Sequence, residues 1–217
     1  MTFVRDYPLE SPSLQETRMV TVFLPDGYRP TSGYPVVFCA DGQAVHGFSD
    51  LLAHTIQRQE TPPVVLIGIH SDPAYRAREY LDGVNAERFR AHERFFAEEG
   101  YLWALSEFQL SLDRLRCAVF GFSNGGAFAL SMGVRHREKY GVVIAFSIAG
   151  GPRRVLGSEY ARRPIARYYL SAGTREIPFL NTVRAVARLL ETHGVEHIIT
   201  QREARHDFSF WNSELCE

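Results

Sequence analysis

Short, uninterrupted apolar runs, separated by helical segments, recur along most of this chain. They are rich in β-branched residues and occupy 36–40, 64–69, 117–120, 142–146, 168–170 and 197–199. Strands of a parallel sheet have this composition because helices bury both of their faces. A further run at 19–24 alternates and then meets Pro25-Asp26-Gly27, which predicts a half-buried strand near a sheet edge.

Helical patterns fill the intervals between these runs. We predict helices at about 46–58, 86–112, 124–138, 178–193 and 208–215, each bounded by Gly, Pro or polar residues. The alternation predicts one α/β domain over 1–217, with a mostly parallel central sheet and helices on both faces. The sequence has no internal repeat or linker that would divide it, and the Gly-Pro-rich stretch around Gly150-Gly151-Pro152 is only loop-sized, so a lid domain has little room.

The composition excludes several classes of partner. The formal net charge of the 217 residues is -1, so the chain lacks the basic field expected of a protein that binds nucleic acid or an anionic membrane. The first residues lack a signal-peptide core, and no apolar run is long enough to span a bilayer. We therefore expect a soluble, cytoplasmic protein that acts on a small molecule. The sequence does not indicate its oligomeric state.

The three cysteines do not suggest a cofactor site. Cys39, Cys117 and Cys216 are odd in number and lack metal-ligand spacing, and the first two fall in apolar strands. We expect core packing from them, and neither a metal nor any other cofactor.

The stretch Gly121-Phe122-Ser123-Asn124-Gly125-Gly126 follows one predicted strand and leads into a helix. Glycines two before and two after the serine permit the tight strand-to-helix turn that lifts a hydroxyl above the end of a parallel sheet. A Gly-rich turn before an ordinary helix is the alternative. The flanking strand and helix, together with downstream partners, favour Ser123 as a nucleophile.

A serine nucleophile needs a base and commonly a carboxylate, in the chain order serine, acid, histidine. His206 follows the last predicted strand and precedes the final helix, so it is the predicted base. His70 ends the strand at 64–69, on the side where such a fold gathers its functional loops. We expect surface or structural roles for the remaining histidines: His46, His54, His92, His136, His193 and His197.

The acid is expected after the next-to-last strand, where Glu176 lies in a turn. A surface carboxylate paired with Arg175, or one capping the helix near Pro178, is the alternative. Asp207 is a weaker candidate because it is adjacent to His206. For the oxyanion we predict the backbone amides of Asn124, after the nucleophile, and Gln43, in the loop Cys39-Ala40-Asp41-Gly42-Gln43. An ordinary Asp-Gly turn is the alternative for this loop.

With these residues placed, the chain resembles the Putative esterase family of α/β hydrolases. That family includes siderophore and feruloyl esterases, S-formylglutathione hydrolase and mycolyltransferases. The resemblance runs from about Leu14 to Leu215. The segments that carry it are 22–28, Pro35-Val36-Val37-Phe38 leading to Asp41-Gly42-Gln43, Arg76-Ala77-Arg78-Glu79-Tyr80, the Ser123 turn, and His206 with Trp211.

The resemblance implies Ser123 as nucleophile, His206 as base and Glu176 as acid, with the Gln43 and Asn124 amides as oxyanion hole. It also implies that the segment bearing Arg76 and Arg78 places an arginine beside an anionic or catecholate substrate. The chain departs from the family's pattern at Leu81-Asp82, where Thr-Pro often follows. We expect a stand-alone catalytic domain without the additional N-terminal domain of enterochelin esterases.

These observations predict a serine hydrolase that cleaves carboxylic esters without a cofactor. An acyltransferase of the same family and a noncatalytic binding module on a hydrolase scaffold are the alternatives. Some siderophore esterases of the family work with a Ser-His dyad, so a dyad stays open beside the triad.

Overall fold

The computed structural model describes residues 3–110, 113–150, 159 and 162–217, and the strands within these ranges form a single sheet. The strand order is β1-β2-β4-β3-β5-β6-β7-β8. The first two pairings, β1 with β2 and β2 with β4, are antiparallel, and all later pairings are parallel. The bounds are β1 Phe3–Ser11, β2 Glu16–Leu24, β3 Val36–Cys39, β4 Val65–Ile69, β5 Cys117–Phe122, β6 Val142–Phe146, β7 Arg167–Gly173 and β8 His197–Arg202.

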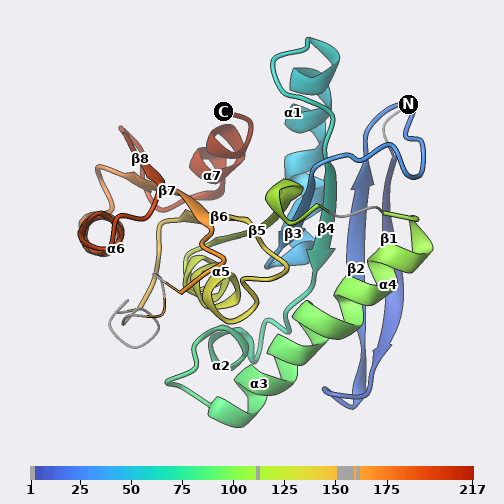
Figure 1. Cartoon of the computed structure of the whole chain (residues 1–217), viewed down its shortest axis with the longest axis horizontal. Helices are drawn as coiled ribbons and strands as arrows, with labels where there is room; N and C mark the ends of the chain where they lie inside the picture. The colour runs from blue at the N-terminus through green and yellow to red at the C-terminus, as the bar shows by residue number, and fades with distance from the viewer. Residues whose placement is uncertain (1–2, 111–112, 151–158, 160–161) are drawn as a thin grey trace.

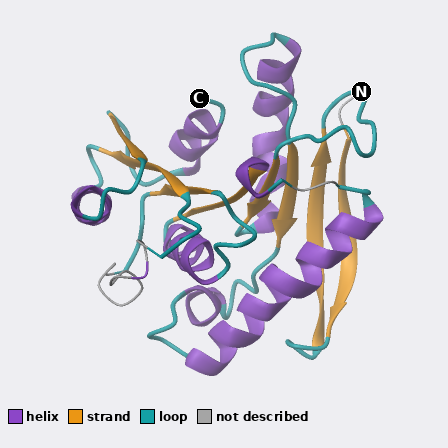
Figure 2. Cartoon of the chain, viewed as in Figure 1, coloured by secondary structure: helices purple, strands orange, loops and turns teal. Residues whose placement is uncertain are grey.

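Helices cover both faces of this sheet (Figures 1 and 2). They are α1 Val45–Gln57, α2 Arg76–Tyr80, α3 Ala86–Arg94, α4 Gly100–Glu107, α5 Asn124–Arg135, α6 Ile177–Thr192 and α7 Phe208–Leu215, with short 3-10 helices η1 Gly42–Ala44 and η3 Arg114–Arg116. One buried apolar cluster joins the sheet to α3, α4, α5 and α6, and a second joins it to α1 and α7. Burial on both faces explains why the central strands are continuous apolar runs.

The predicted α/β class is confirmed, and each predicted strand is present with bounds that differ by a few residues. The strand β1 was missed. It pairs with β2 from the sheet edge, and most of its side chains are exposed or only partly buried, so its sequence lacks an apolar run. Consequently β2 is second from the edge.

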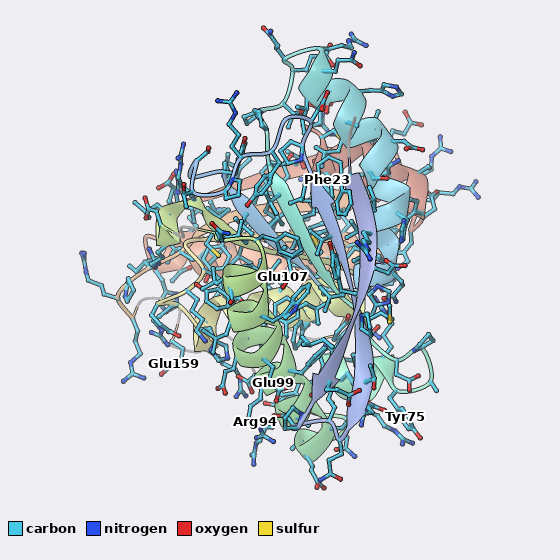
Figure 3. The ribbon with its side chains drawn as sticks, turned by 90° about the vertical axis from the view of Figure 1, so that its right-hand side faces the viewer. Phe23, Tyr75, Arg94, Glu99, Glu107 and Glu159 are labelled. Carbon is cyan, nitrogen blue, oxygen red and sulfur yellow. The ribbon has the colours of Figure 1, made fainter. Side chains whose placement is uncertain are left out.

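The predicted helix at 86–112 is two α-helices joined by one π-helical turn, Phe95–Glu99. Figure 3 shows Arg94, Glu99 and Glu107 along one helical rod. The rod ends at Glu107, because Gln109 has a positive φ of 48° that no α-helix accepts. Residues 111 and 112 lie outside the described ranges.

One short helix was not predicted from the sequence. Helix α2 lies in the Arg76-Ala77-Arg78-Glu79-Tyr80 segment, for which no helix was predicted, and it is only one turn and a half long. Of the predicted loop at Gly150-Gly151-Pro152, the last two residues lie outside the described ranges.

Cys39 and Cys117 are buried in β3 and β5, as expected. Among the described residues, the helices are all too short or too polar to cross a membrane.

Candidate active site

Ser123 occupies a sharp turn between β5 and α5. Its backbone has φ 57° and ψ -124°, which is unusual for a residue with a side chain. The turn is held from both sides: the Ser123 N–H donates to Phe146 O at 3.0 Å, and Ser123 O accepts from Ala149 N at 3.0 Å. A Cβ atom on Gly121 would lie 2.1 Å from Gly125 O, so only glycine fits two residues before the serine. This is the geometry of a nucleophile elbow.

His206 lies in the loop between β8 and α7, and it joins the serine to a carboxylate. Its Nε2 is 3.1 Å from Ser123 Oγ, and its Nδ1 is 2.6 Å from Glu176 Oε2. The neighbouring Asp207 instead accepts the Phe210 N–H at 3.0 Å and caps α7. The carboxylate that faces the imidazole is therefore Glu176.

Glu176 is buried between the end of β7 and the start of α6. Its Oε1 accepts hydrogen bonds from Ser147 Oγ and from Gly173 N, each at 2.6 Å. The surface pairing considered from the sequence is absent from the described residues, since Arg175 pairs with Glu203. Three donors thus hold this carboxylate in one orientation.

Two aromatic rings fix the plane of the imidazole. The Phe179 ring stacks on it with centroids 3.8 Å apart and an interplanar angle of 19°, and the Trp211 ring meets it at 4.9 Å and 87°. The Trp211 Nε1–H donates to Ser147 Oγ at 2.8 Å. Ser147 therefore connects the indole to the Glu176 carboxylate, and the imidazole has little freedom to turn.

The predicted oxyanion donors come from two loops. Gln43 lies in η1 after β3, and Asn124 is the first residue of α5. Within the part of the chain that the structure describes, neither backbone N–H donates to another protein group. Both N–H groups are thus available to an external acceptor.

The other histidines have partners or positions away from Ser123. His70 Nε2 contacts Thr21 Oγ1 at 2.7 Å, and burial lowers the pKa of His70. Of the rest, His54 is exposed on α1 and His92 is buried in the core. The other four have these contacts: His46 with Asp6, His136 with Glu93, His193 with Leu189 O and His197 with Val195 O.

The two predicted substrate-binding arginines lie on α2 in different surroundings. Arg76 makes two hydrogen bonds of 2.6 Å to the Asp41 carboxylate. Arg78 is exposed beside the Tyr75 ring, with its guanidinium carbon 5.5 Å from the ring centroid. It lines a surface hollow of about 350 Å³ together with Gln15 and Asn85. Their contact with a substrate stays a prediction.

Sequence reasoning missed Ser147 and Phe179. Ser147 directly follows β6, so its place at the carboxyl end of a parallel strand was the available signal. Phe179 had no signal, because an aromatic residue in the first turn of a helix is typical of ordinary packing.

Within the described ranges, His, Cys, Asp and Glu form no group of three or more arranged to hold a metal ion.

A mostly parallel sheet, with a serine at a strand-to-helix elbow and a histidine after the last strand, defines the class of α/β hydrolases. More narrowly, the chain belongs to the Putative esterase family, whose model matches residues 11–217. The comparison with curated proteins found no match.

Solved structures of several esterases are similar to this chain. A ferulic acid esterase has a TM-score of 0.83 at 19% identity, covering 100% of this chain and 95% of its own. The enterobactin esterase of Shigella flexneri has a TM-score of 0.81 at 23% identity, covering 98% of this chain but 57% of its own, so this chain spans just over half of its length. The S-formylglutathione hydrolase of Staphylococcus aureus has a TM-score of 0.79 at 12% identity, covering 100% and 94%. At these identities the likeness shows the fold alone.

Proposed function

We propose that this chain is a serine esterase that cleaves carboxylic esters through an acyl-enzyme on Ser123. The observation that carries the proposal is the continuous path of hydrogen-bond contacts from Ser123 Oγ through both nitrogens of His206 to Glu176, at 3.1 and 2.6 Å. Membership of the Putative esterase family supports ester hydrolysis as the reaction class.

In this proposal each group has one role. With Nδ1–H donating to Glu176, His206 Nε2 carries a lone pair that takes the Ser123 hydroxyl proton as Oγ bonds to the ester carbonyl carbon. The negative oxygen that results accepts from the Gln43 and Asn124 amides. His206 then gives its proton to the leaving alcohol. A water molecule repeats the sequence and releases the acid, which restores the serine.

Turnover of p-nitrophenyl acetate tests this proposal. Ser123→Ala should fold normally and lose roughly 10⁴-fold or more in kcat, because the covalent route disappears. His206→Ala should lose a comparable amount. His193→Ala and His197→Ala serve as matched controls, since each imidazole only contacts a local backbone carbonyl. Near-normal turnover by Ser123→Ala, or a larger loss in the two controls than in His206→Ala, would refute the assignment.

Acyl transfer uses the same acyl-enzyme with an alcohol in place of water. Incubation with an ester and an isotopically labelled alcohol separates the two reactions. The proposal predicts mainly free acid, and mainly labelled ester would identify an acyltransferase.

The esterases with similar structures are named for different substrates, so the natural ester of this chain has to be found by assaying a panel of esters. We propose that Arg78, and the Nη1 edge of Arg76, bind a carboxylate or a polarised oxygen of the substrate. Nη1 makes no hydrogen bond among the described residues, whereas Nε and Nη2 are occupied. The panel should therefore contain matched neutral and anionic esters, with p-nitrophenyl acyl chains, feruloyl esters, S-formylglutathione and catecholate trilactones.

A further inference from the structure

A buried ion pair anchors the loop that carries the Gln43 amide. Asp41 lies between β3 and η1, is only 3% exposed, and has a left-handed backbone with φ 55° and ψ 53°. Its carboxylate receives the Arg76 Nε at 2.6 Å and the Arg76 Nη2 at 2.6 Å. A bidentate pair of this kind fixes direction as well as distance. The orientation of Asp41 therefore sets the path of the chain into Gln43.

The same guanidinium also reaches the nucleophile loop. Arg76 Nη2 donates to Phe122 O at 3.3 Å, and Phe122 directly precedes Ser123. The two loops are in close contact here, because a Cβ atom on Gly125 would lie 2.9 Å from Asp41 Oδ2. One side chain from α2 thus ties together the segments that supply the two available amides.

Additional contacts hold Asp41 in its left-handed conformation. Its N–H donates to Tyr80 Oη at 2.6 Å, and Ser71 Oγ donates to its Oδ1 at 3.1 Å. Burial opposes the charge of Arg76, but the hydrogen bonds and charge of Asp41 outweigh burial and raise the pKa of Arg76. A side-chain-bearing residue stays in this region of φ and ψ only where its surroundings enforce it.

We propose that Asp41 and Arg76 are a positioning pair, which aims the Gln43 and Asn124 N–H groups at the oxyanion of the reaction. The inference rests on the esterase function proposed above. Donors that are fixed before the reaction stabilise the developing charge without a cost of reorganisation. In this role the pair acts through the two loops, and the contact proposed above between Arg76 Nη1 and a substrate oxygen is separate from it.

A purely electrostatic role and a positioning role of this pair predict opposite changes in kcat for Asp41→Asn. Asp41→Asn leaves the guanidinium uncompensated near an oxygen that becomes negative, so a purely electrostatic role would raise kcat. A positioning role lowers kcat, because an amide nitrogen cannot accept one of the two guanidinium hydrogen bonds.

The test measures kcat and KM of Asp41→Asn and Arg76→Ala with a neutral ester, p-nitrophenyl acetate. We expect kcat to fall about 10- to 100-fold, somewhat less than the loss of a whole oxyanion donor, with KM nearly unchanged. Methylguanidinium in the buffer should restore part of the kcat of Arg76→Ala, since the Arg76 side chain is 24% exposed and its site is open to solvent.

Arg88→Ala is the matched control for this experiment. The Arg88 side chain is 22% exposed, and its Nε and Nη2 both donate to Oε1 of the buried Glu79 carboxylate, at 3.0 and 2.8 Å. Neither residue of that pair belongs to the elbow or to the η1 loop. Arg88→Ala should lower the thermal unfolding midpoint at least as much as Arg76→Ala does, while it keeps a wild-type kcat.

An unchanged or increased kcat in Asp41→Asn would overturn the positioning role. An equal loss of kcat in Arg88→Ala would overturn it as well, because lost stability would then explain the effect. A selective rise of KM for anionic esters in Arg76→Ala, with kcat intact, would assign Arg76 to substrate binding instead. Full turnover by Ser123→Ala would remove the proposed esterase function itself, and this pair's role with it.

Discussion

The Glu176 carboxylate contacts His206, Ser147 and the Gly173 N–H at distances of 2.6 Å each. A carboxylate that only capped a helix or faced solvent would not need such a buried set of partners. The arrangement favours the proposed triad over a dyad, because it leaves the imidazole one stable orientation.

Glu176→Gln is expected to fold and to lose about 100- to 10,000-fold in kcat. If the amide oxygen keeps the bonds from Ser147 and Gly173, its NH₂ group faces His206 Nδ1. The imidazole then carries its proton on Nε2, where it cannot accept the Ser123 proton. Steady-state turnover of p-nitrophenyl acetate measures the loss.

Asp207→Asn is the control for this prediction, since Asp207 caps α7 and does not face the imidazole. It should turn over at nearly the wild-type rate. Unchanged activity in Glu176→Gln with impaired Asp207→Asn would transfer the acid role to Asp207. Unchanged activity in both would favour a Ser-His dyad.

At the scale of elements, helix α3 packs its His92 into an aromatic part of the core. The imidazole is fully buried, with the rings of Tyr80, Phe95, Phe96 and Phe128 at centroid distances between 5.3 and 6.5 Å. Neither ring nitrogen has a hydrogen-bond partner among the described residues, although Nδ1 is 3.6 Å from the Glu79 carboxylate. Burial lowers the pKa of His92 to about 4, and the charge of Glu79 opposes this shift only in part.

The docking of α3 should therefore weaken in mild acid. Above the unfolded pKa of about 6.5, His92 is neutral in both states and contributes no pH dependence. Between about pH 6.5 and 4 the unfolded chain binds a proton that the folded protein excludes, so the free energy of unfolding falls by up to about 1.4 kcal/mol per pH unit. Urea unfolding between about pH 7 and pH 5 measures this slope.

His92→Phe removes the titrating group and keeps an aromatic ring of similar size. Its unfolding free energy should show a shallower dependence on pH over the same interval. Parallel curves for the variant and the wild type would mean that folded His92 binds a proton as readily as the unfolded chain does.

The elements differ in how far the sequence predicted them. Buried strands such as Val142–Phe146 were recognisable because both of their faces are apolar, and the helix at 208–215 was predicted with its observed bounds. Strand β1 has no such run, because it lies at the edge and depends on pairing with β2. The π turn at Phe95–Glu99 keeps a helical pattern, so one long helix was the natural interpretation.

The residues of the candidate site also differ in how far the sequence could predict them. Ser123 and Asn124 lie in a local motif, and His206 and Glu176 follow from chain order, so all four could be predicted from the sequence as candidates. Phe179 stacks on His206, which is 27 positions away in the sequence, and Ser147 donates to Glu176, which is 29 positions away. No local pattern encodes such contacts, and the pair formed by Asp41 and Arg76 is a further example.

At the scale of the whole molecule, the fold is similar to that of esterases whose named substrates differ, so the fold does not fix the substrate. Arg78 is the residue for which we propose a role in substrate specificity. It is exposed on α2, and it forms no ion pair within the described ranges.

Arg78→Ala should raise KM for anionic esters several-fold more than for matched neutral esters, because a guanidinium is lost near the bound anion. Steady-state kinetics on the two ester series measures this. Arg58→Ala is the control: Arg58 is also exposed, but it follows α1 and pairs with Glu60. Equal changes in KM for both ester series would remove the argument for charge recognition.

Fluorophosphonate labelling tests whether His206 activates Ser123 as a nucleophile. The wild-type protein is treated with the reagent, digested, and its modified residue is located by peptide mass spectrometry. We expect one adduct on Ser123, which is absent in Ser123→Ala, strongly slowed in His206→Ala and retained in His193→Ala. A folded wild-type protein that stays unlabelled, or an adduct that forms equally fast in His206→Ala, would contradict it and favour a noncatalytic binding module or a different base.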